Sequence, residues 1–237
     1  MRKSELKLAL LKNLLGSKPL KLVIFDLDGT LVDSVSDLKC ALDLMHLELN
    51  MATASIEQVR AWVGNGAELL VRRALSYRLD VDVSDGVGLE IGLFETAYAS
   101  FLRHYALVNG QSSSCYDGAL SLIERLKSEG IRVSIVTNKP SRFTLPLLKK
   151  LSISVDVVVS GDTLVRKKPD PMPLNECLRQ LGVPAENAVM VGDSVNDISA
   201  AKAANIASVA VSYGYNHGIP MSSCPADRHV DSLLELQ

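Results

Sequence analysis

The sequence predicts a doubly wound α/β fold, in which helices cover both faces of a parallel sheet, with a helical insertion. Short apolar runs rich in β-branched residues alternate with amphipathic stretches through the second half of the chain. One further run lies near the start, and the mostly helical segment 37–115 separates it from the rest. We therefore expect a discontinuous α/β core at 19–36 and 116–237, a helical domain at 37–115 and an N-terminal amphipathic helix within 1–18.

The predicted strands are continuous apolar runs without polar alternation. Runs of this kind suit parallel strands that are buried on both faces of a sheet. The five runs cover residues 22–25, 131–136, 155–159, 188–191 and 206–211.

Helical patterns with recognisable ends lie between these strands. Asp117 and Gly130 are expected at the two ends of the first pattern, and Gly182 ends the third. The patterns cover residues 117–130, 140–151, 172–181 and 197–204. Right-handed crossovers would place these helices on both faces of the sheet.

The insertion and the N-terminal segment both show helical spacing of apolar residues. Within 37–115 no strand is expected, and the polar stretch 109–114 is the expected linker back to the core. Near the N-terminus, leucines at 6, 10 and 14 share a face, and we expect Gly16 and Pro19 to end that helix. Lys12 interrupts the apolar run, which argues against a signal peptide. We expect the helix to pack on the core or on a partner subunit, with attachment to a membrane surface as the weaker alternative.

Composition narrows the classes of function. The chain has 237 residues, a formal net charge of −2 and only 5% aromatic residues, which argues against a nucleic-acid partner. No apolar run approaches the ~20 residues of a membrane-spanning helix. The four cysteines form no C-x-x-C pair, so we expect reduced thiols in a cytoplasmic protein and no zinc site. A homodimer is compatible with the sequence.

Acidic residues directly follow two of the predicted strands. Asp26 and Asp28 come after the first strand, and Asp193 and Asp197 come after the fourth. Ligands of open parallel sheets bind beyond the carboxyl ends of the strands, so we expect these four carboxylates in one pocket. Crowded carboxylates repel one another, and a divalent cation removes that conflict. An all-oxygen ligand set indicates Mg²⁺.

Two other strand ends supply groups that suit a phosphate. Thr137 and Asn138 follow the second strand, and Lys168 follows the third after a short loop. A hydroxyl, backbone N–H groups and one ammonium beside Mg²⁺ would form a phosphate-binding site.

This set of motifs resembles the haloacid dehalogenase-like hydrolase superfamily. The matching stretches, in the order that family has them, are Asp26-Leu-Asp-Gly-Thr-Leu31, Val136-Thr-Asn138, Lys168-Pro169 and Gly192-Asp-Ser-Val-Asn-Asp197. The resemblance implies a Rossmann-like core with a helical cap at 37–115. Further segments, among them Gly64-Asn65-Gly66 and Gly214-Tyr-Asn-His-Gly218, are similar to the branch that acts on phosphoglycolate.

The resemblance implies a role for each matched residue. Asp26 would be the nucleophile that forms an aspartyl phosphate, and Asp28 would be the general acid and then the general base. Asp26, the backbone carbonyl of Asp28 and Asp193 would hold Mg²⁺. The phosphoryl group would be bound by Thr137, Asn138 and Lys168, and the supporting residues would be Asp197, Thr30 and Ser194.

The cap loop Gly64-Asn65-Gly66 has two interpretations. Its backbone N–H groups would bind a carboxylate of the substrate, or the loop would only connect two helices. Because it follows a helical pattern instead of a strand, it is not a dinucleotide-binding fingerprint.

The leading hypothesis is a Mg²⁺-dependent phosphatase for a small phosphorylated metabolite, with 2-phosphoglycolate as first choice. A phosphomutase or a sugar-phosphate phosphatase of the same superfamily is the first alternative. A phospho-accepting signalling receiver is an alternative of another class, and the insertion at 37–115 counts against it.

Overall fold

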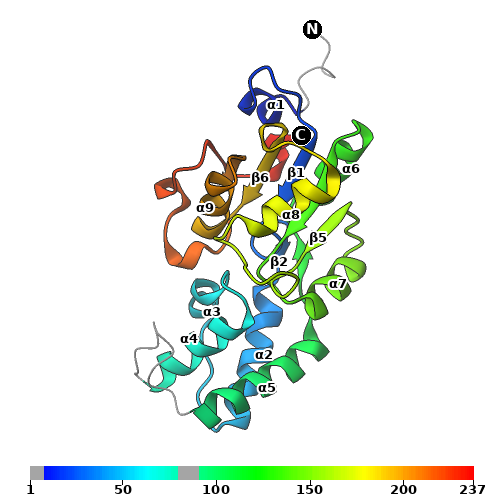
Figure 1. Cartoon of the computed structure of the whole chain (residues 1–237). Helices are drawn as coiled ribbons and strands as arrows, with labels where there is room; N and C mark the ends of the chain where they lie inside the picture. Colours follow the sequence, from blue (N-terminus) through cyan, green and yellow to red (C-terminus); the bar gives the residue numbers. More distant parts are fainter. Residues whose placement is uncertain (1–7, 80–90) are drawn as a thin grey trace.

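The computed structural model describes residues 8–79 and 91–237. Its centre is a six-stranded sheet in the order β5-β4-β1-β6-β7-β8, and every neighbouring pair is parallel (Figure 1). The strands are β1 Leu22–Phe25, β4 Arg132–Val136, β5 Val157–Val159, β6 Ala188–Gly192, β7 Ala207–Val211 and β8 Arg228–Val230. The doubly wound α/β fold is thereby confirmed.

Alternate residues along β1 pack into two separate apolar clusters, one on each face of the sheet. Val23 and Phe25 of β1 belong to one cluster, while Leu22 and Ile24 belong to the other. The helices of the core are α1 Ala9–Leu14, α6 Ala119–Ser128, α7 Ser141–Lys150, α8 Met172–Leu181 and α9 Val195–Ala203. Residues of α1, α6 and α7 pack in the first cluster, and residues of α8 and α9 pack in the second. Both faces of the sheet are therefore covered, which explains the continuous apolar runs.

A helical cap lies beyond one end of the sheet (Figure 1). Its helices are α2 Val35–Glu48, α3 Ile56–Trp62, α4 Ala67–Leu79 and α5 Ile91–Val108. They share an apolar cluster of their own, and α2 and α5 make the most extensive helix–helix contact. Among the described residues, Phe143 and Tyr215 are the buried members of that cluster that lie outside the cap helices and the loops between them.

The two chain crossings between core and cap lie side by side. Strand β2 Val32–Asp33 pairs antiparallel with β3 Ser114–Cys115. Asp37 of α2 is almost fully buried and accepts hydrogen bonds from the backbone N–H groups of Gly110, Ser112 and Ser113. The expected linker at 109–114 is thus tied to the first cap helix and leads into a short strand that the sequence did not predict.

Most predicted elements lie within two residues of their observed bounds, and three details differ. Strand β8 is missed because it is a short edge strand whose Arg228 and His229 are exposed, so it carries no apolar run. Helix α6 begins after Gly118, which has a φ of 86°, so Asp117 is not its N-cap. Helix α9 begins at Val195, two residues earlier than expected, because Ser194 forms a capping box with Asp197.

The N-terminal helix packs against the core. Leu8 and Leu11 are fully buried in the sheet cluster, and Lys12 forms an ion pair with Glu129 at the C-terminal end of α6. Leu6 lies outside the described residues. None of the described helices has the length and apolar character that a membrane crossing requires. The remaining helical turns are η1 Ala185–Asn187, η2 Asn216–Gly218, η3 Met221–Ser223 and η4 Leu233–Leu236.

Candidate active site

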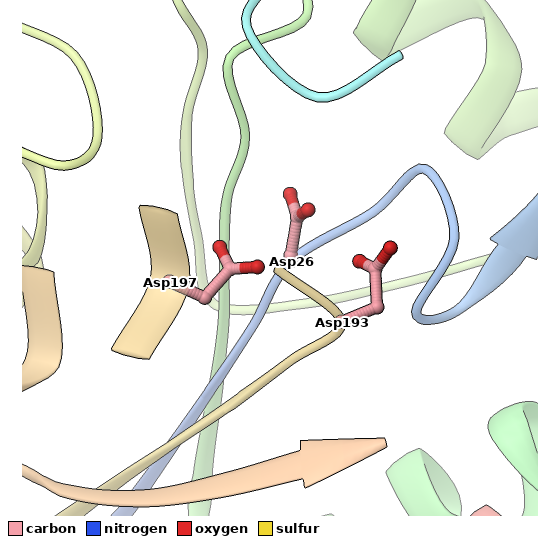
Figure 2. A group of neighbouring side chains, drawn as sticks. All are labelled: Asp26, Asp193 and Asp197. Carbon is pink, nitrogen blue, oxygen red and sulfur yellow. The ribbon is translucent and has the colours of Figure 1, made fainter. Parts of the chain in front are cut away.

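Three carboxylates meet at the carboxyl ends of the two central strands. Asp26 follows β1, Asp193 follows β6, and Asp197 lies in the first turn of α9 (Figure 2). One oxygen from each lies within 4.8 Å of the others, and all three residues are buried. The backbone N–H of Asp26 donates to the carbonyl of Val191, which fixes the end of β1 against β6. The parallel pairing of β1 with β6 therefore brings distant acidic motifs together.

Lys168 neutralises part of this acidic cluster. Its ammonium donates to Oδ1 of Asp197 at 2.6 Å and to the carbonyl of Val136 at 2.6 Å. It also lies 2.8 Å from Oδ1 of Asp26, outside the angular range of a hydrogen bond. Burial by itself would lower the pKa of Lys168, but Asp197 and Asp26 outweigh it and hold that pKa above its usual value. Lys168 is therefore charged and placed against the predicted nucleophile.

Burial and neighbouring carboxylates raise the pKa of two of the carboxyl groups. Burial raises the pKa of Asp26 well above its usual value, and the carboxylates of Asp197 and Asp193 raise it further against the effect of Lys168. Burial and then Asp197 likewise raise the pKa of Asp193. The negative charge of this cluster exceeds what Lys168 offsets, so the site favours an additional cation.

Asp193 is held by two neighbours that leave lone pairs free. The hydroxyl of Thr30 donates to its Oδ1 at 2.7 Å, and the backbone N–H of Tyr215 donates to its Oδ2 at 2.7 Å. Gly29 lies against the same carboxylate, where an added Cβ would come within 2.3 Å of Oδ2 at a φ of 91°. The turn after β1 therefore requires a residue without a side chain.

Asp197 is engaged through both of its oxygens. Oδ2 accepts hydrogen bonds from the backbone N–H and the hydroxyl of Ser194, and Oδ1 accepts from Lys168. The side chain is completely buried. Asp197 therefore orients Lys168 and caps α9, which agrees with a supporting place beside the reacting groups.

Asp28 does not join the carboxylate cluster, although all four acidic residues were expected to crowd together. Its carboxylate accepts hydrogen bonds from Lys139 at 3.0 and 3.2 Å and from the hydroxyl of Ser34 at 2.6 Å. Asp26 and Asp28 are two residues apart, and the turn between them points Asp28 toward the cap. The structure thus separates a carboxylate paired with Lys139 from the three that surround Lys168.

Thr137 and Asn138 line the site from the end of β4. The amide nitrogen of Asn138 donates to the carbonyl of Gly64 at 3.0 Å and to the carbonyl of Lys168 at 2.9 Å. This side chain joins the cap loop to the Lys168 loop, so its amide N–H groups are already engaged. The hydroxyl of Thr137 accepts from the backbone N–H of Lys139 at 3.2 Å.

The cap loop 64–66 connects α3 to α4 and contacts the core through its carbonyls. Besides the contact from Asn138, the ammonium of Lys167 donates to the carbonyl of Asn65 at 2.9 Å. Arg73 donates to Oδ1 of Asn65 at 2.8 Å, within the cap. Gly64 has a φ of 121°, and an added Cβ would lie 3.0 Å from the ring of His217. The helix-connecting interpretation is met, and the same loop also closes the cap onto the core.

A cleft between core and cap contains the site. Asp26, Asp28, Thr137, Asn138 and Lys139 line it from the core. The cap contributes Leu38, Val63, Gly64, Gly66, Ala67, Leu70 and Tyr105, and Pro140 completes the lining. Polar groups thus come mostly from the strand ends and apolar surface from the cap.

Sequence reasoning gave no role to Lys139, Tyr105 and Tyr215. Lys139 directly follows two predicted site residues at the end of β4, which is a signal that the sequence supplies. Tyr105 lies on α5, and the hydroxyl of Tyr215 accepts from the backbone N–H of Ser34 and donates to Asp33. Tyr105 lies outside every motif, so only the packing of cap on core reveals it, whereas Tyr215 belongs to the segment Gly214–Gly218 that the sequence had already singled out.

The donor set fits a divalent cation. Hard cations prefer oxygen ligands, and the free lone pairs of Asp26 and Asp193 face the same space (Figure 2). The raised pKa of both carboxyls, caused first by burial, means that a bound cation would relieve the cost of their ionised form.

Comparison with known proteins gives consistent results. The model of a family described as haloacid dehalogenase-like hydrolase matches residues 23–211. A phosphoglycolate phosphatase of Pseudomonas syringae pv. tomato is 44% identical over 227 residues, 95% of this chain and 81% of that protein. One of Nitrosococcus oceani is 43% identical over 219 residues, 92% of this chain and 95% of that protein.

A solved structure extends the likeness to three dimensions. The crystal structure of a predicted phosphoglycolate phosphatase from Haemophilus somnus has a TM-score of 0.86 and 32% identity, covering 93% of this chain and 98% of that one. The chain therefore belongs to the haloacid dehalogenase-like hydrolases and groups there with phosphatases.

Proposed function

We propose that this phosphatase hydrolyses 2-phosphoglycolate to glycolate and phosphate, with Mg²⁺ bound and with a covalent aspartyl phosphate on Asp26. The observation that carries the proposal is the contact between Asp26 and the buried ammonium of Lys168 at the end of β1. The names of the relatives at 43–44% identity support the choice of substrate.

The first half-reaction transfers the phosphoryl group to the protein. A carboxylate oxygen of Asp26 attacks phosphorus, and the bond from phosphorus to the substrate's bridging oxygen breaks. Asp28, when protonated, gives its proton to the departing oxygen and becomes a carboxylate. Lys168, the hydroxyl of Thr137 and the backbone N–H of Asn138 hold the phosphoryl oxygens, where charge accumulates.

The second half-reaction restores the enzyme. Asp28 now takes a proton from a water molecule, whose oxygen attacks phosphorus and releases Asp26 with inorganic phosphate. The hydrogen bonds to Asp28 from Lys139 and Ser34 orient its carboxylate for this step. Bound Mg²⁺ would be held by Asp26, Asp193 and the carbonyl of Asp28, and it would neutralise charge on the phosphoryl group.

The helical insertion at 37–115 acts as a cap that excludes water in this proposal. Its boundaries fall where β2 and β3 pair, so both crossings can bend together. The loop 64–66 contacts Asn138 and Lys167 of the core, which supports a closed arrangement over the cleft. An opened cap would admit substrate and release glycolate.

Phosphate release from a panel of substrates tests the proposal. With Mg²⁺ present, 2-phosphoglycolate should be hydrolysed with higher kcat/KM than sugar phosphates, nucleotides or pyrophosphate. Asp26→Asn should lower the rate by at least about 10⁴-fold, because the nucleophile is lost. The exposed Asp117→Asn is the matched control and should keep wild-type activity.

The covalent step has its own readout. Mass spectrometry of an acid-quenched reaction should detect phosphate on the peptide that contains Asp26. Activity that survives in Asp26→Asn would contradict the mechanism, whereas a preference for a sugar phosphate would contradict only the substrate. Transfer to a second sugar hydroxyl in place of water would identify a phosphomutase.

A further inference from the structure

Lys139 is buried in the wall of the cleft and contacts a different carboxylate from the two that contact Lys168. Its side chain is 3% exposed, and it is the one cationic side chain among the described residues that line the cleft. Lys168 faces Asp26 and Asp197, but Lys139 faces Asp28 and the cap. The site therefore has two separate cations, and the phosphoryl chemistry requires only the first.

Lys139 links the acid–base residue to a cap helix. Its ammonium donates to both oxygens of Asp28, at 3.0 and 3.2 Å, and also to the hydroxyl of Tyr105. Tyr105 belongs to α5, and its ring packs between Phe101 and Phe143 with centroid distances of 5.4 and 4.7 Å. This packing holds the hydroxyl in place beside the cleft. Because that hydroxyl accepts a hydrogen bond from Lys139, its own proton is free to be donated to a ligand.

The buried ammonium of Lys139 has the carboxylate of Asp28 as its ionic partner, at 3.0 Å. Across the cleft lie apolar cap residues, among them Leu38, Val63 and Leu70. An anionic group that enters such a pocket is stable only if a cation with hydrogen-bond donors meets it.

We propose that Lys139 and the Tyr105 hydroxyl bind the carboxylate of the leaving alcohol, so that they select phosphate esters of small hydroxy acids. The inference rests on the proposed function and deepens it, because it names the residues that recognise the part of the substrate that is not phosphate. One N–H of Lys139 can span both oxygens of Asp28 and a second donates to Tyr105, so a third remains for the carboxylate of the substrate. The leaving oxygen and this carboxylate would then lie on the same side of the cleft. The backbone N–H groups of loop 64–66 were one expected site for this carboxylate. In this proposal they contribute less than the ammonium of Lys139 and the hydroxyl of Tyr105.

A pair of matched substrates tests the inference. In 2-hydroxyethyl phosphate a neutral CH₂OH group replaces the carboxylate of 2-phosphoglycolate. Lys139→Met should lower kcat/KM for 2-phosphoglycolate by on the order of 100-fold more than for 2-hydroxyethyl phosphate. The quantity compared is the ratio of kcat/KM for 2-phosphoglycolate to kcat/KM for 2-hydroxyethyl phosphate. Any loss caused by disturbing Asp28 affects both substrates and cancels in this ratio.

A second test variant and a control variant complete the experiment. Tyr105→Phe retains the packed ring and should lower the same ratio by about 10-fold, because one hydrogen bond is lost. Exposed Lys202→Met is the matched lysine control and should leave the ratio unchanged. A binding measurement with 3-phosphonopropionate, which cannot be hydrolysed, should show the same order of weakening in Lys139→Met.

The outcomes separate this inference from the proposed function. If the wild type does not prefer 2-phosphoglycolate over 2-hydroxyethyl phosphate, the proposed substrate is wrong and this inference falls with it. If the wild type shows that preference and both Lys139→Met and Tyr105→Phe keep it, only the carboxylate-binding role is overturned. A selective loss for the carboxylate substrate in either variant supports the role.

Discussion

The strand-end site and the helical cap are stabilised by different kinds of contact. At the strand ends, buried charged groups contact each other directly, as in the three partners of the Lys168 ammonium. In the cap, an apolar cluster between α2, α4 and α5 provides the packing, and it includes completely buried Leu42, Met45 and Phe101. The two regions meet through polar contacts, among them Lys139 with Tyr105 and Asn138 with the carbonyl of Gly64.

This difference separates chemistry from selection. The core residues that would transfer the phosphoryl group depend on one another electrostatically, so a change in one alters the others. The cap residues that face the cleft depend mainly on packing, and they contribute shape and one hydroxyl. A variant of the cluster around Lys168 should therefore affect catalysis for every substrate, whereas a variant of the cap or of its contact with Lys139 should affect stability or substrate preference.

The largest effect is expected from Lys168→Met. It removes the cation beside Asp26 and leaves the buried Asp197 without its charged partner. We expect activity to fall by at least about 10³-fold for all substrates and stability to fall by about 3–5 kcal/mol. Kinetics on several phosphate esters and urea unfolding measure the two losses.

The exposed Lys149→Met controls for loss of one positive charge and should change neither quantity. If Lys168→Met affected one substrate class alone, the division between a catalytic core and a selective cap would be wrong.

A smaller effect, on stability, is expected from Leu42→Ala in the cap. Leu42 is fully buried in the cap cluster, so its truncation should cost about 2–5 kcal/mol. Because this cluster is separate from the two that cover the sheet, hydrogen exchange should increase in α2 and α5 far more than in β1 and β6.

Leu122→Ala in α6 is the matched variant of the core cluster and should show the reverse pattern of exchange. Equal loss of protection in core and cap for both variants would show that the two regions unfold as one unit.

The smallest effect concerns pH and the metal-free protein. Burial raises the pKa of Asp193 to about 7 in the folded chain, whereas an unfolded aspartate titrates near 3.8. The folded state therefore binds this proton more strongly, and the free energy of unfolding should decrease as pH rises from about 4 to about 7. Thermal unfolding in the presence of a chelator measures this slope.

Asp193→Asn removes one of the two carboxyls whose pKa is raised and should reduce the slope over that range, leaving the contribution of Asp26. Added Mg²⁺ should stabilise the wild type more at pH 8 than at pH 5, since protons compete with the cation. An unchanged slope in Asp193→Asn would exclude this carboxyl as its source.

Much of the catalytic edge could be predicted because its residues directly follow apolar strands. Asp26 and Asp193 lie just beyond β1 and β6, and parallel pairing places strand ends together whatever the intervening chain does. Strand β8 was missed because its polar, exposed residues give no periodic signal. The same holds for the helix start at Gly118, since a glycine N-cap resembles any turn glycine.

The sequence by itself determined most of the sheet, the insertion and the carboxylates at the strand ends, because local hydrophobic patterns and strand-end motifs specify them. Only the tertiary structure decided that Asp28 pairs with Lys139 and lies outside the carboxylate cluster. It also decided that Lys139 contacts Tyr105, which precedes it by 34 residues in the chain. It also decided that Asn138 and loop 64–66 join core to cap. These contacts depend on how the core and the cap, each with its own apolar cluster, pack against each other. Short-range sequence patterns carry no information about that geometry.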